Sequence, residues 1–296
     1  MKPKSWYQSY FKGVKLLAHK QYDNGFKYLE VVNESARAKV ALQGAHLFHY
    51  ERAGEVPLIW LSQKSFFEHG KVIRGGIPVC WPWFGKYPRN SELPQHGFAR
   101  NSLWELKETH EIDAHTTEVI LQLQPSAEHF KLWPRTAELF LTITIGRTLT
   151  LSLRSKNCDT HAFEISSALH SYFAIDNIEN VSVKGLAGRL YFDKVTGQEQ
   201  TQQGSLTIAK EVDRIYQNVD YPVTLHDKSR TIEVDARGSS STIIWNPWKE
   251  NSISMADMEN DSYKTMLCIE AGNALGDTIL LAPGEEHTLT AMISAY

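Results

Sequence analysis

The segment LPQHGFAR, residues 93–100, places an amide, an imidazole and a guanidinium within six positions, on Gln95, His96 and Arg100. Pro94 and Gly97 disfavour a regular helix, because proline lacks a backbone donor and glycine is conformationally free. Amide and guanidinium groups bind hydroxyls and anions. The segment therefore predicts a stiff loop that recognises a polar ligand, although by itself it is only suggestive.

Three further segments hold candidate acids and bases. Glu270 ends the apolar run MLCIEAG, and a carboxylate there is costly to bury unless it is paired or functional. His170 lies inside the apolar run FEISSALHSYFAI, where a lone histidine is more often a satisfied core residue than a catalytic one. Asp213 in EVDRIYQNV could be functional, or it could form a surface ion pair with Arg214.

An aromatic segment precedes the loop. VIRGGIPVCWPWFG, residues 72–85, carries Arg74 together with three aromatic side chains, Trp81, Trp83 and Phe84. Aromatic rings that face the apolar side of a sugar, with arginine and glutamine on its hydroxyls, are typical of a carbohydrate pocket. The equally good alternative is a structured loop that is packed by its own tryptophans.

The elements that must position these residues are mostly strands. In ELFLTITIGRTLTLSLRS every second residue is apolar on either side of Gly146, which predicts a hairpin, and similar alternation recurs to the C-terminus. Short helices are expected only after Leu61 and in the polar stretch ADMENDSYKT. Many short strands predict an all-β fold, a large antiparallel sandwich or barrel, as a single domain over residues 1–296.

Composition and missing motifs exclude several classes of protein. With 31 basic and 34 acidic residues, 42% hydrophobic and 22% charged, the chain predicts a soluble protein with no nucleic-acid partner. The N-terminal residues lack a signal-like apolar run, and no stretch is long enough for a membrane span, which predicts a cytoplasmic protein. Three distant cysteines read as reduced thiols. Nucleotide-binding, zinc and nucleophile-elbow motifs are missing, so neither a metal nor a cofactor is expected.

Six segments together resemble a known family. RGGIPVCWPWFG, LPQHGFARNSLWEL, ALHSYF, VDRIY, IWNPW and CIEAG resemble, in this order, the D-hexose-6-phosphate mutarotases of the aldose 1-epimerase (galactose mutarotase-like) superfamily. The resemblance runs from about residue 30 to the C-terminus, and the first thirty residues are less recognisable. It implies a large antiparallel β-sandwich and an enzyme that interconverts α and β anomers without a cofactor.

The resemblance also implies a role for each matching residue. His170 would be the general acid and Glu270 the general base, so that ring opening and closure need no other reactant. Arg74, Gln95 and Arg100 would bind the substrate, above all its phosphate, since guanidinium groups pair well with phosphate oxygens. Asp213 would hold a sugar hydroxyl, and His96 would line the pocket. The expected partner is a small sugar phosphate bound by a monomer.

Three alternatives stay open at this point. A non-catalytic sugar-binding sandwich would keep the arginines and tryptophans but would not need His170 and Glu270. A glycoside hydrolase would use Asp213 and Glu270 as its two carboxylates. If Arg74 and Arg100 do not converge, a mutarotase of an unphosphorylated aldose becomes the better interpretation.

Overall fold

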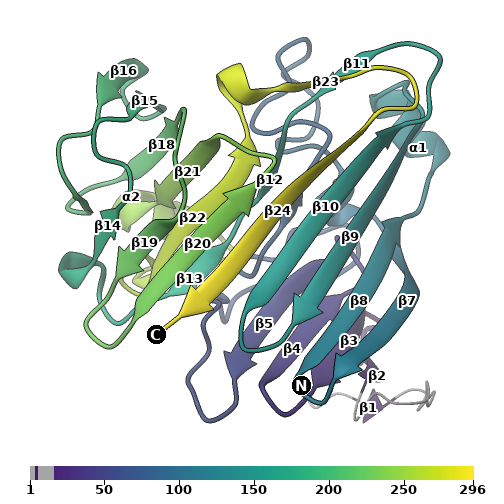
Figure 1. The fold of residues 1–296 in the computed structure, drawn as a ribbon, viewed down its shortest axis with the longest axis horizontal. Coiled ribbons are helices and arrows are strands. Elements are labelled where there is room, and N and C mark those ends of the chain that lie inside the picture. Colours follow the sequence, from purple (N-terminus) through teal and green to yellow (C-terminus); the bar gives the residue numbers. More distant parts are fainter. Residues whose placement is uncertain (1–3, 6–16) are drawn as a thin grey trace.

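The computed structural model describes residues 4–5 and 17–296, and the segment predicted to lack a signal peptide lies largely outside these residues. The largest sheet of the described chain has nine strands (Figure 1). In spatial order they are β17 (Leu206–Thr207), β14 (Ser182–Lys184), β19 (Val223–His226), β20 (Thr231–Arg237), β24 (Glu286–Ala295), β10 (Leu149–Asn157), β9 (Ala137–Ile145), β8 (Thr116–Leu123) and β7 (Trp104–Asp113).

A second sheet of eight strands carries the candidate site. Its strands are β16 (Gln198–Thr201), β15 (Leu190–Asp193), β18 (Val212–Tyr216), β21 (Ser241–Asn246), β22 (Met266–Asn273), β12 (Ser167–Leu169) and β6 (Val79–Cys80), with β13 (Tyr172–Ala174) also on β22. Two smaller sheets contain β1 (Lys4–Ser5), β2 (Leu17–Gln21), β3 (Lys27–Val32), β4 (Ala36–Ala41) and β5 (His46–Arg52), and β11 (Phe163–Ile165) with β23 (Ile279–Leu281).

The strand pairs are antiparallel, and the predicted hairpin is confirmed. β9 and β10 pair in register around the turn, with Ile145 opposite Leu149 and Leu141 opposite Leu153. The alternating apolar residues of both strands are buried, because successive side chains of a strand point to opposite faces of the sheet. The prediction of an all-β, antiparallel fold is therefore confirmed.

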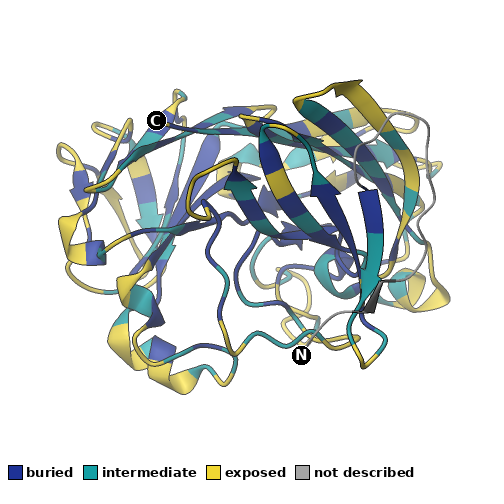
Figure 2. Cartoon of the chain, turned by 90° about the horizontal axis from the view of Figure 1, so that it is seen from below, coloured by how far each residue is buried: buried dark blue, intermediate teal, exposed yellow. Residues whose placement is uncertain are grey.

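The main core lies between the two large sheets. Leu267 and Ile269 of β22 are fully buried in the same apolar cluster as Leu151 of β10 and Leu289 of β24. Figure 2 shows buried residues, in dark blue, along the strands of the interior, and exposed residues, in yellow, mostly at the periphery. Since one face of the eight-stranded sheet is used by this core, its other face is free to carry polar side chains.

The helices are where the sequence-based predictions are wrong. The described chain has two α-helices, α1 (Ala127–Leu132) and α2 (Trp248–Ser254), and four 3₁₀ turns, η1 (Ala99–Asn101), η2 (Ile178–Asn180), η3 (Ser262–Lys264) and η4 (Leu275–Asp277). Residues 62–72 form turns and bends, and the ADMENDSYKT stretch contains only η3. The polar side chains explain this difference.

Side chains near Leu61 satisfy backbone groups in a way that competes with a helix. The Ser62 hydroxyl donates to the Asp257 carbonyl at 2.7 Å, and the Glu259 carboxylate accepts from the Gln63 amide at 2.7 Å. In contrast, Ser126 caps α1 by accepting from the amide of His129, a helix-start signal that is present in the sequence. Among the described residues no helix is long and apolar enough to cross a membrane.

Candidate active site

All seven residues singled out from the sequence line one cavity of about 200 Å³ on the face of the eight-stranded sheet that points away from the main core. They are Arg74, Gln95, His96, Arg100, His170, Asp213 and Glu270. They come from distant parts of the chain, so the tertiary fold is what brings them together. In particular, Arg74 and Arg100 reach the same cavity, which is the condition on which a phosphate site depends.

Strand register explains how the sheet presents the site. Asp213 of β18 is paired with Trp245 of β21, Trp245 with Cys268 of β22, and Cys268 with Tyr172 of β13. Directly paired residues of antiparallel strands point to the same face, so these four side chains form a row. Glu270 lies two residues beyond Cys268 on β22 and therefore points to this face as well.

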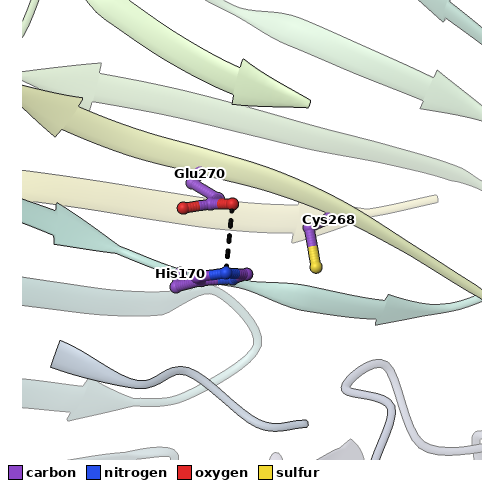
Figure 3. Close-up of side chains that lie close together, drawn as sticks. All are labelled: His170, Cys268 and Glu270. Atoms are coloured by element: carbon purple, nitrogen blue, oxygen red, sulfur yellow. Dashed lines mark ion pairs between the residues drawn. The ribbon is translucent and has the colours of Figure 1, made fainter. Parts of the chain in front are cut away.

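His170 and Glu270 are in direct contact. Nε2 of His170 lies 3.3 Å from Oε1 of Glu270, and both side chains are almost completely buried (Figure 3). His170 follows β12, its amide donates to the carbonyl of Pro78 at 3.0 Å, and its ring stacks on Tyr172 with centroids 4.8 Å apart. The fold therefore places the two groups side by side.

Burial controls the protonation of this pair. Burial, followed by the nearby His96 and the positive charges of Arg100 and Arg74, lowers the pKa of His170 well below its usual value. Burial, followed by the negative charge of Asp213, raises the pKa of Glu270 well above its usual value. Both shifts favour the uncharged forms, a neutral imidazole next to a protonated carboxyl, because burial disfavours charge on either group.

Two polar atoms of the pair lack a protein partner. Nδ1 of His170 and Oε2 of Glu270 are buried and form no hydrogen bond with any of the described residues. Most buried polar atoms in native structures are hydrogen-bonded, so unpaired ones inside a cavity indicate where a ligand supplies the missing partner. A sugar, which carries a hydroxyl on nearly every carbon, meets that requirement.

Cys268 lies beside the pair, and its sulfur is within 4.8 Å of the ligand atoms of His170 and Glu270 (Figure 3). Three such groups could in principle hold a metal ion. The thiol, however, is completely buried, and burial raises the pKa of Cys268 well above its usual value, which disfavours the thiolate that a metal requires. The chemistry of the trio favours proton transfer by His170 and Glu270 over metal binding.

The predicted recognition loop is stiff for a clear reason. Gly97 has a φ of +71°, and a β-carbon there would lie 2.0 Å from the carbonyl oxygen of Trp81, so only glycine fits. The amide of His96 donates to the carbonyl of Gly85 at 2.7 Å, and the amide of Gly85 donates to Nδ1 of His96 at 3.2 Å. Nδ1 is thus an acceptor, which leaves Nε2–H of the neutral imidazole as a donor.

Arg100 is a cation without a counter-ion. Its Nη2 donates to the carbonyl oxygen of Gln95 at 2.7 Å, but its buried Nε has no partner, and no carboxylate among the described residues lies within ion-pairing distance. Burial lowers the pKa of Arg100, yet a guanidinium stays protonated near neutral pH. A partly buried positive charge with no carboxylate partner is costly, so this position is prepared for an anion.

Arg74 is held in place by protein groups. Its Nε donates to the Asp257 carboxylate at 3.2 Å, and Nη1 donates to the Tyr172 hydroxyl at 3.3 Å. Asp257 therefore offsets the charge of Arg74, and the net positive charge of this end of the cavity rests on Arg100.

Packing decides between the two interpretations of the aromatic segment, and it adds neighbours that sequence reasoning missed. Trp81 and Trp83 belong to the main core and do not line the cavity, whereas Phe84 does, together with Trp245 of the IWNPW segment. Lys194, which follows β15, also lines the cavity and was missed because its surroundings, FDKVTGQ, read as an ordinary turn.

The alternative prediction that Asp213 forms a surface ion pair with Arg214 is wrong. Arg214 lies on the opposite face of β18 and pairs with Asp193 at 3.3 Å, while Asp213 pairs with Lys194 at 2.7 Å. Neighbouring residues of a strand point to opposite faces, so the two side chains of an adjacent pair cannot share one environment.

Comparison with known proteins agrees with this geometry. Residues 27–294 match the aldose 1-epimerase family. The chain belongs to that family. It is 40% identical, over 82% of both chains, to an Escherichia coli K12 protein provisionally named glucose-6-phosphate 1-epimerase, and 34% identical to a relative with that provisional name from Cenchrus ciliaris, over 90% and 86% of the two chains.

Solved structures agree in fold with this assignment. A Salmonella typhimurium protein provisionally named a mutarotase matches with a TM-score of 0.89 at 34% identity, over 97% of this chain and 95% of that one. A galactose mutarotase-like protein of Lactobacillus casei, 15% identical with a TM-score of 0.71 over 91% and 100% of the two chains, shares the fold. The family member described here is an isomerase of the aldose 1-epimerase type.

Proposed function

We propose that the protein interconverts the α and β anomers of D-hexose 6-phosphates, with glucose 6-phosphate as the representative substrate. One observation carries this proposal: an unpaired guanidinium, that of Arg100, lines the same small cavity as the contacting pair His170 and Glu270. The relatives' provisional name, glucose-6-phosphate 1-epimerase, agrees with it.

Ring opening requires one proton to leave the C1 hydroxyl and one to reach the ring oxygen. Both oxygens are bonded to C1, so a base and an acid that lie side by side can serve them together. In the assigned roles Glu270 accepts the proton of the hydroxyl and His170 donates to the ring oxygen. The C1–O5 bond breaks as the C1 carbonyl forms, and after rotation about C1–C2 the same transfers in reverse close the ring on the other face.

The proton balance of the pair fits this cycle. The pKa directions favour a proton on Glu270, and movement of that proton to His170 would create the carboxylate and the imidazolium that the assigned roles need. A bound phosphate would offset the charges of Arg74 and Arg100, which both lower the pKa of His170. Phosphate binding therefore favours a proton on His170, and the substrate helps to prepare its own acid.

The remaining residues would bind and orient the sugar. The carboxylate of Asp213 accepts from a ring hydroxyl, and the side chain of Gln95 and Nε2–H of His96 supply further contacts. Trp245 and Phe84 line the cavity and can face the apolar side of the ring. We also propose that the chain works as a single-domain monomer in the cytoplasm, since the substrate class is an intracellular metabolite.

Exchange spectroscopy of the H1 signals of glucose 6-phosphate tests the proposal at equilibrium. Cross-peaks between the α and β signals should grow faster with enzyme than with buffer at the same phosphate concentration. No acceleration for any hexose 6-phosphate would leave the non-catalytic sugar-binding sandwich as the better interpretation. Equal acceleration of glucose and glucose 6-phosphate would favour a mutarotase of unphosphorylated aldoses.

A further inference from the structure

Lys194 is a charged residue of the cavity to which neither the family resemblance nor the proposed mechanism assigns a task. Its Nζ lies 2.7 Å from Oδ2 of Asp213 and 5.9 Å from the ring centre of Phe84. The side chain is 30% exposed and that of Asp213 is 20% exposed, so the pair lies at the rim of the cavity. Asp213 and Glu270 both line this cavity.

The turn that carries Lys194 is held firmly. The amide of Lys194 donates to the carbonyl of Asp213 at 2.8 Å, so backbone and side chain both tie it to the same residue. The preceding Asp193 accepts from the amides of Val195 and Thr196 at 3.0 and 3.1 Å, and Arg214 pairs with Asp193 at 3.3 Å. The ammonium group of Lys194 therefore starts from a fixed backbone.

The charges around Glu270 show what this ammonium group can do. Asp213 brings a negative charge toward Glu270, which favours a proton on Glu270, and Lys194 and Arg100 bring positive charges, which favour the carboxylate. The titratable and charged groups that face Glu270 and His170 from the surrounding elements are Asp213, Lys194, Arg100, Arg74, His96, Tyr172 and Cys268. Of these, Lys194 alone contacts Asp213 in an ion pair among the described residues.

We propose that Lys194 is a positioning residue of the reaction, whose ammonium group holds the Asp213 carboxylate in place and offsets its charge at Glu270. Without Lys194, the negative charge of Asp213 would act on Glu270 with no ion-pair partner to offset it, which favours a proton on Glu270. With Lys194, Glu270 can release and regain the proton during each ring opening, while Asp213 stays available for a sugar hydroxyl. This inference rests on the proposed anomer exchange.

The test is a double-mutant cycle that is read through the pH dependence of kcat/KM for glucose 6-phosphate. Lys194→Met removes the charge at nearly constant volume. The acid limb of its profile, the low-pH range over which kcat/KM rises with pH, should move to higher pH by about one unit. This is the lower end of the pKa shift that a nearby charge causes. Lys194→Arg keeps the charge and should stay within about 0.3 unit of the wild type. Lys194→Met should also lower kcat/KM at the pH optimum by about tenfold, because Asp213 is then no longer held in place. In the Asp213→Asn background, where no carboxylate is left to hold, the same change should lower kcat/KM by less than about twofold. The direct effect of the Lys194 charge on Glu270 persists in both backgrounds, so the limb should shift in both.

A matched control makes the outcome decisive. Lys86→Met removes an exposed lysine close in sequence to Phe84 that does not line the cavity, and it should leave the profile unchanged. The proposal is overturned if Lys194→Met lowers kcat/KM at the pH optimum equally with and without Asp213, or if its whole effect is a rise in KM with an unchanged pH profile. The second result would make Lys194 a direct substrate contact.

A second measurement keeps this test independent of the proposed function. The ¹³Cε1 signal of His170 reports the protonation of the pair, and its titration midpoint should also move upward in Lys194→Met. If the wild-type protein fails to exchange anomers, the proposed function falls, whereas an unmoved His170 midpoint in Lys194→Met overturns the role of Lys194.

Discussion

Replacement of Arg100 by methionine tests the phosphate site most directly, because Arg100 is the guanidinium without a counter-ion. Its only hydrogen bond to the described residues is to the carbonyl of Gln95, and its Nε is buried without a partner. A guanidinium that binds phosphate through two charge-assisted hydrogen bonds gains about 1.5–3 kcal/mol from each. In the variant, water can enter the space and replace part of this hydrogen bonding to the phosphate. We therefore expect Arg100→Met to lose about 3–4 kcal/mol of transition-state stabilisation, roughly 100- to 1,000-fold in kcat/KM.

The loss should be selective for the phosphorylated sugar. Exchange spectroscopy should show the fall for glucose 6-phosphate and less than about a threefold change for glucose, because methionine keeps the volume of the site. Inorganic phosphate should inhibit the wild type competitively and inhibit Arg100→Met far more weakly. Arg89→Met is the matched control, since Arg89 is exposed on the same segment and does not line the cavity.

Stability separates this effect from misfolding. Burial lowers the pKa of Arg100, which means that the folded protein bears the cost of a desolvated charge. In phosphate-free buffer, Arg100→Met should therefore melt at the same temperature as the wild type or a higher one. Equal losses on glucose and glucose 6-phosphate, with an unchanged Tm, would refute the assignment of Arg100 to the phosphate.

The remaining predictions concern the acid–base pair and the loop. His170→Ala and Glu270→Gln should each lower kcat by about 100- to 10,000-fold, whereas a glycoside hydrolase would tolerate the first and lose turnover completely in Asp213→Asn. Burial raises the pKa of Glu270 in the folded state. Glu270 therefore lowers the free energy of unfolding at pH values above its unfolded pKa of about 4.3, and this loss grows as the pH rises toward the folded pKa. Calorimetry should therefore show that Glu270→Gln raises Tm more at pH 8 than at pH 4.5, and an equal gain at both would contradict this. Gly97→Ala should destabilise by about 3 kcal/mol or more in urea titrations, because its β-carbon meets the Trp81 carbonyl, whereas Gly85→Ala, with open space around it, should cost about 1 kcal/mol.

Much of the fold and of the site could be read from the sequence because local patterns carry them. Alternating apolar residues on either side of Gly146 predicted the β9–β10 hairpin, since a strand with one buried face needs that period. The seven polar residues lie in segments whose composition is unusual for a loop or an apolar strand, and all seven line one cavity. A polar side chain is costly to bury, so its presence in an apolar segment can be noticed in the sequence alone, and the same cost marks it as a candidate site residue.

Contacts between distant segments could not be read from any local pattern. The 3.3 Å approach of His170 to Glu270 depends on how β12 and β13 pair with β22, and the Lys194–Asp213 pair depends on how β15 pairs with β18. Trp81 and Trp83 look like sugar platforms in the sequence, and only packing shows that they belong to the core. Residue types and their spacing therefore determined which chemistry the chain can offer. Tertiary structure alone decided which groups meet and which of them keep a proton, because distance and burial are properties of the folded chain.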